Sequence, residues 1–127
     1  MESDALGDDV LRFIREHIDM VPQLEALILA CETAPRGWSA AELAGRVYVS
    51  TEAADWILQD LESRRLLQRL PDGRYAFAAD NPAAPLVASV ATAYRKHLVR
   101  VTQAIHSKAS SAGIREFARA FNIKKDR

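Results

Sequence analysis

Residues 50–77, STEAADWILQDLESRRLLQRLPDGRYAF, constrain the fold more than any other part of the sequence. In their first half, apolar residues recur at the three- and four-residue spacings of one helix face: Ala54, Ile57, Leu58 and Leu61. Their second half holds two short apolar runs, LLQRL and RYAFA, separated by Pro-Asp-Gly. Because proline presets the first turn angle and glycine adopts a positive φ easily, this pattern predicts a helix followed by a β-hairpin.

Three more helical segments are expected before residue 50. Residues 8–20, with the adjoining Val21, carry a mainly apolar stripe: Val10, Leu11, Ile14, His17, Ile18 and Val21. A second helix starts near Pro22, a residue well tolerated in the first turn of a helix, and ends before Pro-Arg-Gly at 35–37. A third, at 39–46, begins with a capping box in which Ser39 and Glu42 exchange hydrogen bonds and Trp38 packs on Leu43. Ser50 or Thr51 then caps the helix that precedes the hairpin.

The C-terminal part of the sequence predicts one long helix. The stretch DNPAAP at 80–85 is a linker, and a heptad-like apolar stripe follows it: Val87, Val90, Tyr94, Leu98, Val101 and Ile105. Such a stripe needs a partner surface, either the first helix of the same chain or the same helix of a second copy. We favour the second copy, and hence a homodimer. The expected division is a domain at 1–80 and a helical dimerisation or docking segment with a basic tail at 81–127.

Composition fits one compact domain with an appended element. The chain has 127 residues, of which 49% are hydrophobic and 27% charged. No apolar run is long enough to span a membrane and the N-terminus lacks a signal-peptide pattern, so we expect a cytoplasmic protein without membrane contact. Cys31 falls in an apolar run and is expected to be a small buried thiol.

Charge is distributed unevenly along the chain. Residues 1–62 hold 13 acidic and 4 basic side chains, a balance of −9, and residues 63–127 hold 4 acidic and 13 basic, a balance of +9. A basic half that binds nucleic acid, oppositely charged halves that meet, and charges that only solvate two faces all remain open.

Enzymatic chemistry finds no support in the motifs. His17, His97 and His106 are dispersed and show no spacing typical of metal ligands. The five glycines form no phosphate-binding loop, and no serine lies in a nucleophile elbow. We therefore expect no enzyme activity, no metal and no cofactor.

The segment SAAELAGRVYVSTEAADWILQDLESRRLLQRLPDGRYAF resembles the winged helix-turn-helix module of bacterial regulators of the MarR and PadR type. The resemblance covers residues 21–78, and the chain end also looks like that of short uncharacterised bacterial winged-helix proteins. It implies a mainly α fold with a small β-hairpin and a role in the regulation of gene expression. Arg65 stands where such modules commonly have glycine before Leu66.

Two functions are open for such a module. In the first, the protein binds double-stranded DNA through the predicted hairpin, the wing of such a module, and through the basic residues beside it, with few base contacts from the preceding helix. The candidate residues are Arg46, Thr51, Gln59, Arg64, Arg65, Arg69 and Arg74. In the second, an acidic helix face with a solvent-facing indole binds a basic protein partner; the candidate residues are Glu52, Asp55, Trp56 and Gln59. Because DNA is a polyanion, the two carboxylates on that face count against the first function.

Overall fold

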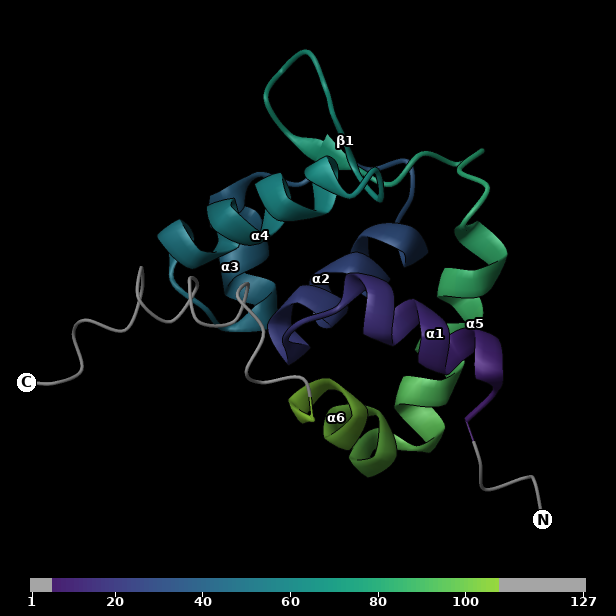
Figure 1. Cartoon of the computed structure of the whole chain (residues 1–127). Helices are drawn as coiled ribbons and strands as arrows, with labels where there is room; N and C mark the ends of the chain where they lie inside the picture. The colour runs from purple at the N-terminus through teal and green to yellow at the C-terminus, as the bar shows by residue number, and fades with distance from the viewer. Residues whose placement is uncertain (1–5, 108–127) are drawn as a thin grey trace, which may run out of the picture. The chain divides into compact units, whose positions relative to one another are not determined.

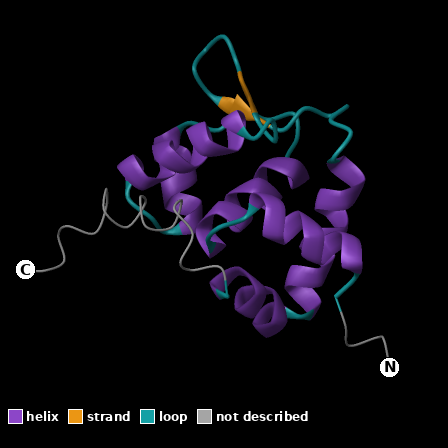
Figure 2. Ribbon diagram, viewed as in Figure 1, coloured by secondary structure: helices purple, strands orange, loops and turns teal. Residues whose placement is uncertain are grey.

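The computed structural model describes residues 6–107 and shows a mainly helical chain with one small hairpin (Figures 1 and 2). The elements in order are α1 Asp8–His17, α2 Val21–Glu32, α3 Ala40–Val47, α4 Thr51–Ser63, β1 Gln68–Arg69, β2 Tyr75–Ala76, α5 Ala84–Lys96 and α6 Leu98–His106. The fold class predicted from the sequence is confirmed. The chain divides into two compact units, one of residues 22–88 and the other of residues 1–21 with 89–127. The first helix therefore falls outside the unit that contains the hairpin, whereas the boundary predicted at residue 80 placed both in one domain.

The unit of residues 22–88 has the helix, helix, helix, hairpin order of a winged helix. Helix α2 is largely buried, and its buried residues include Leu24, Ala26, Leu27 and Ala30. Helices α3 and α4 pack against each other, and the hairpin leads off from the end of α4 (Figure 1). Buried Gln23 on α2 donates a side-chain hydrogen bond to Asp60 on α4 at 2.5 Å, which satisfies its amide inside the unit.

The hairpin, called the wing below, forms where the turn chemistry predicts it. Its strands are antiparallel, with Gln68 opposite Ala76 and Arg69 opposite Tyr75. Gly73 has a φ of +91°, the positive value expected of glycine in this turn. A third segment joins the sheet, because Trp38 and Tyr75 exchange two backbone hydrogen bonds of 2.7 and 2.9 Å. The wing is thereby attached to the residue that precedes α3.

The other unit contains α1, the end of α5, and α6, with α1 and α6 in contact. The predicted single C-terminal helix is wrong: it is interrupted at His97, whose φ of −132° and ψ of 53° are not helical. The interruption separates α5 from α6, and α6 buries Val101 and Ile105 completely. The sequence left two partners open for the apolar stripe: the first helix of the same chain and a second copy. The contact of α6 with α1 supports the first helix of the same chain.

The basic residues after 107 lie outside the described part of the chain. Within residues 6–107, no helix is long and apolar enough to cross a membrane.

Candidate functional site

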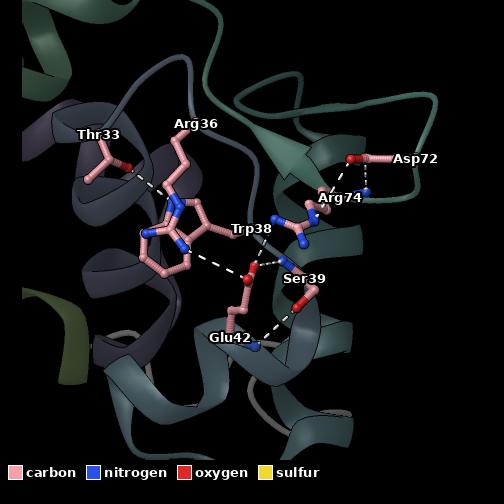
Figure 3. A network of polar contacts seen from close by, with 7 residues as sticks. All are labelled: Thr33, Arg36, Trp38, Ser39, Glu42, Asp72 and Arg74. Carbon is pink, nitrogen blue, oxygen red and sulfur yellow. Dashed lines mark hydrogen bonds and ion pairs between the residues drawn. The ribbon is translucent and has the colours of Figure 1, made fainter.

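The best-organised polar cluster of the winged-helix unit surrounds the start of α3 (Figure 3). We call it the Trp38 junction; its members are Thr33, Arg36, Trp38, Ser39, Glu42 and Arg74. Trp38 is 2% exposed, and its indole N–H donates to the hydroxyl of Thr33 at 3.0 Å. The predicted capping box is present, since the Glu42 backbone N–H donates to Ser39 Oγ at 3.1 Å and the Ser39 N–H donates to Glu42 Oε1 at 3.0 Å.

Two arginines from distant parts of the unit meet the carboxylate of Glu42. Arg36 approaches within 3.8 Å, and its guanidinium stacks 3.7 Å from the centroid of the Trp38 ring. Arg74, from the wing, lies 3.5 Å from Glu42 and 3.8 Å from Asp72. The hydrogen bond from the Ser39 backbone lowers the pKa of Glu42 most, and the positive charges of Arg74 and Arg36 lower it further against the opposing effect of burial. Glu42 therefore links the loop before α3 to the wing as an anion.

The exposed face of α4, called the acidic face below, differs from this junction in composition. Its exposed members are Thr51, Glu52, Asp55, Gln59, Glu62 and Ser63. Gln59 donates to Asp55 at 2.6 Å, so its amide is already engaged within the helix. The face carries three carboxylates and no cation, a composition that opposes the approach of a phosphate backbone.

The arginines predicted to bind DNA have different surroundings. Arg64 is half-buried and bound to Asp60 at 2.7 Å, in the network that includes Gln23. Arg74, expected at the tip of the wing, is paired at the Trp38 junction instead. Arg46 is exposed with its guanidinium 5.4 Å from the centroid of the Trp38 ring.

Arg65 and Arg69 remain as exposed cations near the wing. Arg65 adopts a φ of +65°, so it occupies the left-handed position for which the resemblance implies glycine. Arg69 is exposed on β1, with its guanidinium 5.9 Å from the centroid of the Tyr75 ring. Neither has a carboxylate partner among residues 6–107.

Some of the residues predicted to bind a partner or a second copy are more buried than the sequence suggests. Trp56 is half-buried, not solvent-facing. Within the apolar stripe, Tyr94 is half-buried and Leu98 is 51% exposed, but the other four members are buried in the single chain: Val87, Val90, Val101 and Ile105. The burial of these four residues in the single chain is at odds with a homodimer that uses the complete stripe. Homodimer formation stays a prediction.

Tyr48 is a surface residue that the sequence patterns did not single out. It ends α3 in the left-handed conformation, with a φ of 60°, and its side chain is 90% exposed. Non-glycine residues rarely adopt this conformation, and a large exposed aromatic side chain is common at recognition surfaces. The absence of glycine from VYVS, where the chain turns between two helices, is the signal that would have drawn attention to it.

Residues 6–107 contain no group of three or more His, Cys, Asp or Glu side chains that could hold a metal ion. Cys31 is half-buried, and desolvation followed by the charge of Glu32 raises the pKa of its thiol.

These elements define the class of fold: a winged helix whose wing is bridged to the residue before α3. The sequence matches no family model and no curated protein. Among solved structures, it is similar to the crystal structure of the MarR family protein Rv2887 from Mycobacterium tuberculosis, with 23% identity and a TM-score of 0.46 over 92% of this chain and 82% of that one.

Proposed function

We propose that this protein regulates gene expression by contacting double-stranded DNA through its wing and the residues next to it, with α4 held away from the base edges. The observation that carries the proposal is the distribution of arginines around the wing. Arg65 and Arg69 are exposed and lack a carboxylate partner within the described residues, whereas the acidic face bears three carboxylates. Cations at the wing can bind phosphates or enter a minor groove without help from the preceding helix.

The Trp38 junction supports this orientation. Arg74 is held by Glu42 and Asp72, and the wing backbone is bonded to Trp38, so the wing and the start of α3 form one connected element. A connected wing can present Arg69 with little loss of conformational entropy on binding. Because few base contacts come from α4, the expected sequence preference is weak.

The test is the retention of sheared genomic DNA by the purified protein at two salt concentrations, followed by sequencing of the retained fragments. We expect retention that falls as salt rises, with a dependence of log affinity on log salt that flattens by about 0.9 for each phosphate contact removed. The double variant R65E/R69E should abolish retention. The double variant E52K/D55K, which reverses two charges on the acidic face, should leave retention intact or strengthen it. Retention that survives R65E/R69E would contradict the proposal.

A second candidate function is supported by the acidic face and Tyr48. Here α4 binds a basic segment of a protein partner, with Tyr48 as an aromatic anchor and Glu52 and Asp55 orienting the partner. In this case E52K/D55K and Y48A weaken the binding of a lysine- and arginine-rich peptide, and R65E/R69E does not. The same two double variants thus separate the two functions.

A further inference from the structure

A hollow of about 430 Å³ lies between the end of α4 and the wing. The residues that line it come from the winged-helix unit, and the polar ones are Glu62, Arg65, Gln68, Arg69 and Asn81. Its volume is within the range of sites that bind small molecules, roughly 300 to 1,000 Å³. Two arginines against one glutamate give these residues a net positive charge.

The lining residues offer N–H groups that the described part of the protein does not use. Asn81 accepts a hydrogen bond from the Ala83 backbone through Oδ1, which leaves its amide N–H groups as donors. Arg65 and Arg69 have no carboxylate partner, and the Gln68 side chain has no hydrogen bond, within residues 6–107. Two guanidinium groups and two amides can all donate, and an oxyanion is the ligand that accepts from all of them.

The backbone holds Arg65 in an unusual conformation beside this hollow. Its N–H donates to the Glu62 carbonyl at 2.9 Å, while the N–H groups of Leu66 and Leu67 both reach the Leu61 carbonyl. These bonds fix the end of α4 through main-chain atoms alone. A glycine would satisfy the φ of +65° with less strain, so the fold does not require an arginine side chain here. Non-glycine residues in strained positions cluster at functional sites.

We propose that this hollow binds an oxyanion, a phosphate or carboxylate group, with Arg65 and Arg69 as its charged donors and Gln68 and Asn81 as neutral ones. The anion can be a free small molecule or a phosphate of a DNA backbone. The inference uses two arginines that also serve the proposed DNA contact, but it concerns a defined site that a free anion can fill without DNA.

The experiment is a titration of the isotope-labelled full chain with inorganic phosphate at low salt, followed through the arginine side-chain N–H signals by NMR. We expect saturable shifts of the Arg65 and Arg69 signals. R65G and R69Q should each weaken the affinity at least about tenfold, the loss typical of a hydrogen bond to a charged group. R12A is the matched control, because it removes the same charge from exposed Arg12 on α1. It should leave the affinity unchanged.

R65G also separates binding from folding. Because glycine suits the backbone at residue 65, the melting temperature of R65G should be no lower than that of the parent chain. A loss of phosphate binding at unchanged melting temperature supports the site. A fall in affinity of equal size in R12A would show general attraction of anions and overturn it, as would shifts that never saturate with either phosphate or a short DNA duplex.

A parallel titration with the duplex identifies the source of the anion. Saturable shifts at Arg65 and Arg69 with the duplex alone assign the site to backbone phosphates. Phosphate binding without retention of genomic DNA supports the site and counts against the proposed function. Retention of DNA with no change in the Arg65 and Arg69 signals would overturn the site, and it would also show that DNA is bound elsewhere than at these two arginines.

Discussion

Helices α3 and α4 both begin at a serine cap, yet their first turns have very different surroundings. At α3, Ser39 and Glu42 exchange two hydrogen bonds, and arginines from the preceding loop and from the wing converge on Glu42. At α4, Ser50 accepts one hydrogen bond from the Ala53 backbone N–H at 3.0 Å, and the adjacent Thr51 and Glu52 are exposed. The same local signal thus starts a helix that holds the wing and a helix that presents a carboxylate-rich face.

This difference explains how the protein can have an acidic face on α4 and still keep its wing in place. The wing is attached through Trp38 and Glu42 at α3, so it does not depend on polar side chains of the acidic face of α4. The acidic face is correspondingly free of a role in holding the wing. Variants of the two regions should therefore affect stability unequally.

The largest expected effect is the loss of the Trp38 side chain. W38A removes a fully buried indole from beneath Arg36 and should lower the free energy of unfolding by about 3–5 kcal/mol, measured by urea denaturation. W56A, which removes an indole that is only half-buried on α4, should cost clearly less. If W38A does not fold, W38F serves instead: it keeps a ring but loses the hydrogen bond to Thr33, at a cost of about 1 kcal/mol. Equal losses in W38A and W56A would contradict the role of the Trp38 junction.

The next effect compares the two caps directly. S39A and S50A each remove a hydroxyl that accepts from a backbone N–H, a change that typically costs about 1 kcal/mol. We expect S39A to cost more, because the reciprocal bond from the Ser39 N–H to Glu42 is part of the same box. Thermal melting of the two variants under one set of conditions is sufficient. A larger loss in S50A would mean that the surroundings of α3 add nothing to its cap.

The features predicted correctly from the sequence are those with local causes. The capping box is read from four consecutive residues, and the wing from Pro71-Asp72-Gly73 between apolar runs. The left-handed backbone at Arg65 was not predicted, although the resemblance places glycine at this position. In each case the residues that cause the structure are neighbours in the chain.

The errors concern interactions between distant residues. The bridge between Trp38 and Tyr75, and the pairing of Arg74 with Glu42, bring together residues more than thirty positions apart and leave no local pattern. The predicted single C-terminal helix failed because its apolar spacing continues through His97, and no proline or glycine marks the break there. Spacing also could not distinguish a stripe buried in its own chain from one that pairs with a second copy.

The smallest of the three effects isolates the charge of Glu42. Glutamine can replace glutamate in a capping box, so E42Q keeps the hydrogen bond to the Ser39 N–H while removing the anion that holds Arg36 and Arg74. Because folding lowers the pKa of Glu42, its charge stabilises the native state at neutral pH, and this contribution is lost as the pH falls below the ordinary glutamate value of about 4.3 and through the lower folded value. The melting temperature of E42Q should therefore lie below that of the parent chain at neutral pH, and the two should converge in acid. E52Q is the matched control on α4, where Glu52 has no ion pair within residues 6–107, and it should show no such convergence. A constant difference between E42Q and the parent chain across this pH range would mean that the wing is held by the Trp38 backbone and ring alone, without the charge of Glu42.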